Sequence, residues 1–78
     1  MTRARLHLTF PEHTIQEPIV WRLGHEFGLV TNIRRANVED VHGWVILEVD
    51  GSDDDLTRGI AWLGDQGVQV DRILDENR

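Results

Sequence analysis

The fold can be worked out from residues 44–56, which read WVILEVDGSDDDL. The first seven of these residues alternate between two faces, which is the period of a strand that buries one side. Asp50 and Gly51 then turn the chain, and Ser52 is a good N-cap for a helix whose first turn holds three aspartates. The stretch therefore predicts a strand followed directly by a helix. We expect three side chains on the buried face of the strand: Val45, Leu47 and Val49.

On the C-terminal side, the predicted helix carries an apolar stripe and ends at Gly67, and residues 68–74 predict a last strand. On the N-terminal side, residues 29–39 form an extended segment. A turn at 41–43 joins it to the strand at 44–50, so the two strands make a hairpin. Polar residues are unusually dense in this segment, which indicates a β-bulge or an edge position.

The first part of the chain predicts a strand and a helix. Residues 3–10 alternate between apolar and polar side chains. Residues 14–17 match a capping box, which places a helix start at Thr14 with Pro18 in the first turn. Gly28 ends this helix. Its apolar face consists of Ile15, Ile19, Leu23 and Phe27.

The elements follow the order strand, helix, strand, strand, helix, strand. Because crossovers are right-handed, this order predicts an α+β fold, the ferredoxin-like β-α-β-β-α-β sandwich. In this fold two helices cover one face of a four-stranded antiparallel sheet, and the first and third strands are central. We expect a single domain over residues 1–78, with a core of about residues 3–74.

The composition narrows the classes of function. The 78 residues carry a net charge of −6, which argues against nucleic acid as a partner. Cysteine is absent, so disulfides, thiolate metal sites and a thiol nucleophile are excluded. No apolar run is long enough to cross a membrane, and the N-terminal residues do not resemble a signal peptide. We therefore expect no membrane insertion and a cytoplasmic location.

Residues suited to catalysis or to metal and cofactor binding are sparse. The four histidines are scattered, and the acidic run at residues 50–55 lacks the spacing of a calcium loop. Ser52, the only serine, is better explained as a helix cap than as a nucleophile. The glycines fit neither the P-loop nor the dinucleotide pattern. We therefore expect no metal, no cofactor and no enzymatic activity.

The polar segment holds the first candidates for binding. The amide of Asn32 both donates and accepts hydrogen bonds, so it can bind the carboxylate or the ammonium group of an amino acid. Arg34 or Arg35 can pair with a carboxylate. The alternative is a solvated edge strand whose charges prevent aggregation.

Exposed apolar side chains are the second group of candidates. Trp44 and Ile46 alternate with the buried residues of their strand, so they lie on the sheet face away from the helices, where a partner can cover them. Isolated exposed apolar residues are also ordinary in monomers. Trp21 projects from the first helix roughly opposite its apolar face, where it can anchor a contact or fold onto a neighbouring loop.

Several short motifs, taken in order, resemble those of a known family. They are LHLTF at residues 6–10, Pro18, FGLVTNI at 27–33, ANVE at 36–39, Gly43 and Gly51 on either side of a strand, IAWL at 60–63 and GVQV at 67–70. Together they resemble a NIL domain, the small module at the C-terminus of the ATPase subunit of bacterial methionine importers. The resemblance covers about residues 6–74.

The resemblance implies a ferredoxin-like fold similar to that of ACT domains and side-by-side pairing of two copies. It also implies that methionine binds near the paired interface and regulates uptake. By the same resemblance, Asn32 contacts the ligand, and its neighbours Thr31 and Ile33 line the same site.

Two hypotheses follow for the function. The first is a free-standing regulatory module that forms a homodimer and binds methionine or a related amino acid at the interface. Its ligand-binding residues would be Thr31, Asn32, Ile33 and Arg34. The second is an interaction subunit without a small ligand, which docks on a larger enzyme or transporter. Its interface residues would be Trp44, Ile46 and Trp21.

Overall fold

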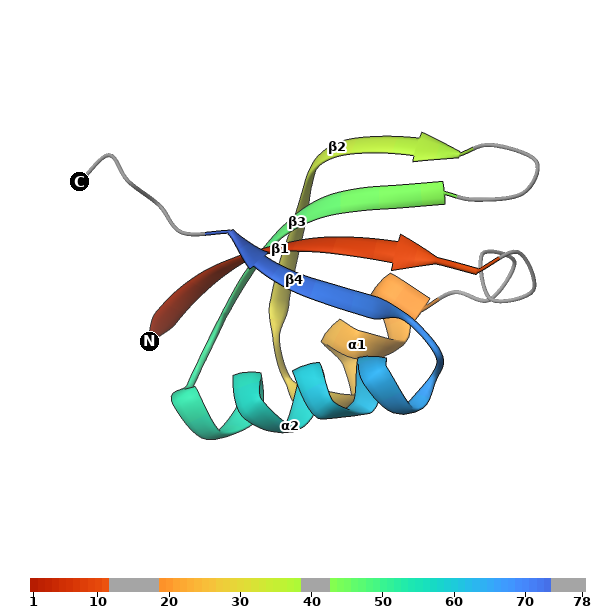
Figure 1. Ribbon diagram of the computed structural model, residues 1–78. Coiled ribbons are helices and arrows are strands. Elements are labelled where there is room, and N and C mark those ends of the chain that lie inside the picture. The colour runs from red at the N-terminus through yellow and green to blue at the C-terminus, as the bar shows by residue number, and fades with distance from the viewer. Residues whose placement is uncertain (12–18, 39–42, 74–78) are drawn as a thin grey trace.

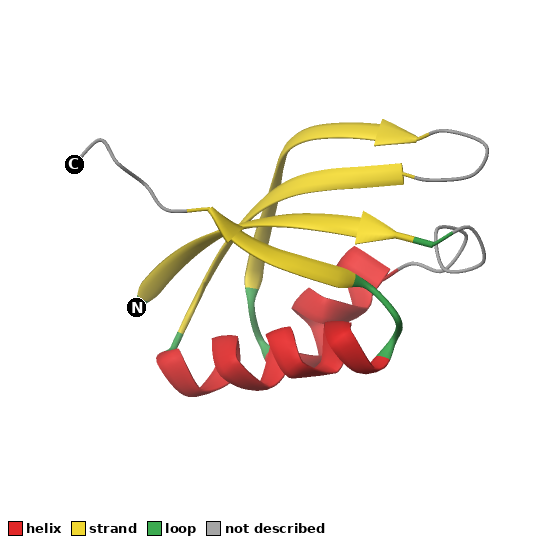
Figure 2. Ribbon diagram, in the orientation of Figure 1, coloured by secondary structure: helices red, strands yellow, loops and turns green. Residues whose placement is uncertain are grey.

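The structure is a computed structural model that describes residues 1–11, 19–38 and 43–73 (Figure 1). Its elements in chain order are β1 (Thr2–Phe10), α1 (Ile19–Phe27), β2 (Val30–Val38), β3 (Gly43–Gly51), α2 (Asp53–Asp65) and β4 (Gln69–Ile73). The strands form one antiparallel sheet in the order β2-β3-β1-β4, so β1 and β3 are central. Both helices lie on one side of the sheet (Figure 2). The predicted ferredoxin-like sandwich is confirmed.

The core lies between the sheet and the helices, and the alternation of the two central strands builds it. Leu6 pairs directly with Leu47, and Leu8 pairs with Val45, so these side chains point to the same face. Leu47 and Leu8 are completely buried. The helices bury Ile19 and Leu23 from α1, and Leu56 and Leu63 from α2.

The ends of the helices follow the local rules that the sequence indicated. The Ser52 hydroxyl accepts a hydrogen bond of 3.1 Å from the backbone N–H of Asp55, as expected of an N-cap. Gly28 and Gly67 follow the two helices with φ of +66° and +86°, which other residues rarely adopt. The predicted capping box at residues 14–17, Pro18 and the turn at residues 41–42 lie outside the described residues.

Gly59 allows the two helices to pack closely. A Cβ atom at Gly59 would lie 2.9 Å from Leu29 Cδ1 and 3.0 Å from Leu23 Cδ1. A larger residue at this position would therefore displace core side chains. Close packing of α2 against α1 gives this small domain a dense core.

Strand β2 is an edge strand and also contains a bulge. Ile33 pairs with Leu47, but Arg35 and not Arg34 pairs with the next residue of β3, Ile46. Arg34 is therefore the extra residue of the bulge. Both explanations that the sequence offered for the dense polar residues of this strand are confirmed.

Neither of the two described helices has the length and apolar character needed to span a bilayer.

Candidate functional site

The sheet face opposite the helices is open, and its side chains form rows across the four strands. Residues that pair directly in an antiparallel sheet point to the same side. One row runs Arg35, Ile46, His7, Asp71, and the next runs Asn32, Glu48, Arg5, Ile73. Beside them, the rings of His7 and Trp44 stack with their centroids 5.5 Å apart. The open face therefore combines charged groups with aromatic and aliphatic surface.

Ion pairs between β1 and β3 organise the charges of this face. Arg5 Nη2 donates a hydrogen bond of 2.6 Å to Glu48 Oε2, and Arg3 Nε donates one of 2.8 Å to Asp50 Oδ1. The side chain of Glu48 is only 10% exposed, and that of Arg5 is 37% exposed. The hydrogen bond from Arg5 lowers the pKa of Glu48, burial opposes this, and the nearby charges of Arg34, Arg5 and Arg3 lower the pKa further.

This lowered pKa predicts a loss of stability in acid. The Glu48 carboxylate stabilises the fold at pH values above the ordinary pKa of 4.5, and this contribution is lost as the pH falls through the lower pKa of the folded state. We expect the stability difference between the wild type and Glu48→Gln to narrow when the pH falls from 7 to 3. Urea unfolding at a series of pH values measures this difference. A gap that is constant or widens in acid would contradict this role of Glu48.

The predicted ligand residues lie along the exposed edge strand β2, but on both of its faces. Asn32 pairs with Glu48 and points to the open face. Thr31 and Ile33 pair with Val49 and Leu47, so they belong to the helix side of the sheet. Ile33 is nevertheless 53% exposed, because β2 lies at the edge. A ligand can reach all three side chains only at the free edge of the strand.

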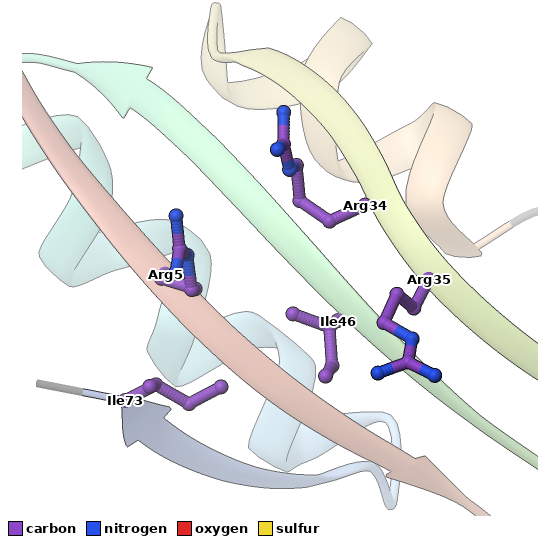
Figure 3. A pocket seen from close by; sticks show the side chains of 5 residues that line it. All are labelled: Arg5, Arg34, Arg35, Ile46 and Ile73. Carbon is purple, nitrogen blue, oxygen red and sulfur yellow. The ribbon is translucent and has the colours of Figure 1, made fainter. Parts of the chain in front are cut away.

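Arg34 lines a depression on the open face. Its volume is about 370 Å³, and its lining residues are Arg5, Arg34, Arg35, Ile46 and Ile73. They come from all four strands. In Figure 3 the five side chains lie in front of the sheet with the helices behind it. Ile46 lies between Arg5 and Arg35, and Arg34 points away from Ile46. The arrangement offers cationic groups around an apolar floor.

A comparison with known protein families decides to which family the chain belongs. The NIL domain family matches residues 4–72, which is most of the chain. The chain belongs to the NIL domain family.

This NIL domain is similar to a part of one longer protein and to one domain of known structure. It is 35% identical over 72 residues to the methionine import ATP-binding protein MetN of Coxiella burnetii (strain RSA 493 / Nine Mile phase I). The match covers 87% of this chain but 20% of MetN, so the chain spans about one fifth of the length of that relative. It also resembles the crystal structure of the C-terminal domain of an ABC transporter / ATP-binding protein from Enterococcus faecalis. That match has a TM-score of 0.79 and 18% identity, and covers 94% of this chain and 86% of the other. This second likeness supports the fold.

The three predicted interface residues of this NIL domain do not form one surface. Trp44 and Ile46 are half-buried on the open face, as their alternation in β3 indicated. Trp21 is 63% exposed on α1, which covers the other side of the sheet (Figure 1). Its ring stacks on His25 of the next helical turn, with the centroids 4.6 Å apart. A single flat partner therefore cannot cover all three side chains.

Ser52 is engaged as a helix cap. Within residues 1–11, 19–38 and 43–73, no group of three or more metal-ligating side chains gathers. Sequence reasoning missed two residues of the depression, Arg5 and Ile73. Alternation placed Arg5 on a polar face, but only the pairing of β1 with β3 and β4 brings it beside Ile46 and Ile73.

Proposed function

We propose that this NIL domain is a regulatory module that binds methionine or a related amino acid at an interface between two copies, with β2 at that interface. The observation that carries the proposal is Asn32, exposed on an edge strand whose free side is able to pair with a second copy. Membership of the NIL family and the likeness to a methionine import ATP-binding protein support the choice of ligand.

The edge of β2 supports the pairing. Strand β2 is bonded to β3 on one side, and no other strand of the described residues lies on its second side. A free strand edge presents unpaired N–H and C=O groups that a second strand can satisfy. Val30 is 60% exposed and Ile33 is 53% exposed, so pairing would also bury apolar surface.

The side chains of β2 suit an amino acid held at this edge. An amino acid carries one carboxylate, one ammonium group and one side chain. The amide of Asn32 can donate to the carboxylate and accept from the ammonium group, and the Arg34 guanidinium can pair with the carboxylate. Ile33 offers apolar contact to a methionine side chain on the other face of the strand. The two faces of one strand thus serve different parts of the ligand.

The substitution Asn32→Ala tests this assignment. We expect it to weaken methionine binding about 10- to 100-fold, because a hydrogen bond to a charged group contributes roughly 1.5 to 3 kcal/mol. Isothermal titration calorimetry measures the change. Gln69→Ala is the matched control, since it also removes an exposed amide from an edge strand, but at β4. Equal affinity for the Asn32→Ala variant and the wild type would refute the site.

A second candidate is docking on a larger protein without a small ligand. The observation in its favour is that the chain matches one fifth of an ATP-binding protein of an importer. The half-buried pair Trp44 and Ile46 would supply the contact. This candidate predicts a monomer that binds no amino acid, so the same titration, together with the molar mass in solution, separates it from the first.

A further inference from the structure

The arginine-lined depression on the open face shares Arg34 with the proposed amino-acid site but is otherwise lined by different residues. Arg35, Arg5 and Ile73 line it, and Asn32, Thr31 and Ile33 do not. The site therefore does not depend on methionine binding at the strand edge. Arg34 is the one residue of the proposed amino-acid site that also reaches the depression.

The bulge in β2 places two positively charged side chains at the depression. In a regular strand, consecutive side chains point to opposite faces. Because Arg34 is the extra residue of the bulge, both it and Arg35 line the depression on the open face. Two arginines thus line one depression although the chain carries a net charge of −6, and in Figure 3 their guanidinium groups point to opposite ends of it. A bulge that re-aims a side chain is typical of binding sites.

The arginines that line the depression do not all have ion-pair or hydrogen-bond partners among the described residues. Glu48 accepts a hydrogen bond from Arg5, but Arg34 and Arg35 form no ion pair with any residue of the described ranges. The Nε atom of Arg5 is buried and lacks a hydrogen-bond partner in the part of the chain that the structure describes. This atom has almost no accessible surface, so the exposed guanidinium groups of Arg34 and Arg35 are the donors available to a ligand. The site therefore favours a ligand with negatively charged oxygens.

The floor of the depression is apolar. Ile46 lies at its centre and Ile73 at the edge provided by β4 (Figure 3). A volume of about 370 Å³ is within the range of small-molecule sites, roughly 300 to 1,000 Å³. The geometry points to a small amphipathic anion as the ligand. We propose that its carboxylate or phosphate group is bound by Arg35, and that its hydrocarbon part lies on Ile46 and Ile73.

Titration with simple probes tests the proposal. We expect hexyl phosphate and hexanoate to bind with dissociation constants on the order of 1 mM or tighter. In methyl NMR spectra they should shift the signals of Ile46 and Ile73. Hexan-1-ol lacks the charge and inorganic phosphate lacks the chain, so both should bind at least several-fold more weakly. Arg35→Gln should weaken hexyl phosphate binding about 10-fold, since charge-assisted hydrogen bonds are lost.

The matched control is Arg72→Gln. Arg72 is exposed on β4 but pairs with Leu6, so it belongs to the helix side of the sheet, and its loss changes the net charge equally. The proposal is overturned if the anions do not bind at about 10 mM, if hexan-1-ol binds as well as they do, or if Arg72→Gln has the same effect as Arg35→Gln. Asn32→Ala should leave hexyl phosphate binding unchanged. Failure of methionine binding alone would therefore count against the proposed function and not against this site.

Discussion

Replacing Leu47 with alanine should lower the free energy of unfolding by about 3 to 5 kcal/mol. Leu47 is fully buried at the centre of β3, opposite Leu6, so the substitution removes apolar contacts and leaves a cavity. A domain of 78 residues has a total stability of roughly 4 to 12 kcal/mol. The variant should therefore unfold at a clearly lower urea concentration than the wild type, which urea titration followed by circular dichroism measures.

Ile46→Ala is the matched control for this experiment. Ile46 is the preceding residue of the same strand, but it points to the open face and is only half-buried. Its truncation should cost about 1 kcal/mol, in the range of partly exposed positions. A loss at Ile46 as large as that at Leu47 would mean that the sheet buries both faces, and would contradict the two-layer arrangement.

Ile33→Lys should convert the proposed homodimer into a monomer. A twofold interface along β2 would bring two new lysines together, and like charges across an interface cost several kcal/mol. We expect the dimer dissociation constant to rise roughly 100-fold or more. Size-exclusion chromatography with light scattering measures the molar mass over a range of protein concentrations.

The matched control uses the other edge of the sheet. Ile73→Lys places the same charge on β4, which lies at the opposite edge from β2. This variant should remain dimeric. Dissociation of Ile73→Lys with retention of the Ile33→Lys dimer would place the interface at β4, and a monomeric wild type would exclude the homodimer.

Local rules in the sequence were enough to predict most of the fold. The alternation at residues 44–50 identified the buried apolar side chains of β3, because the period of two leaves one choice of inner face. Ser52 marked the start of α2, and Gly28 and Gly67 marked the ends of both helices through their backbone conformations. These signals depend only on residues that are neighbours in the chain, so they can be recognised in a single sequence.

The candidate sites were predicted less completely, because they depend on pairing between distant segments. The sequence identified Asn32 and the two arginines as polar residues of one strand. It could not show that a bulge turns Arg34 and Arg35 to the same face, since this follows from the register of β2 against β3. The burial of Glu48 likewise depends on Arg5, which is 43 residues away in the chain. Alternation along a strand predicts the sheet face to which a side chain points, but not which residues of the adjacent strands lie beside it.

Thermal unfolding of the wild type with methionine is the most direct test of the proposed amino-acid binding. At about 10 mM, a ligand with a dissociation constant of ~1 mM stabilises the folded state by about 1.4 kcal/mol. The melting temperature of a domain this small should then rise by about 5 °C or more, and leucine or glutamate should raise it less. An unchanged melting temperature with methionine and with every other amino acid of a panel would contradict the proposal that this NIL domain is an amino-acid-binding module.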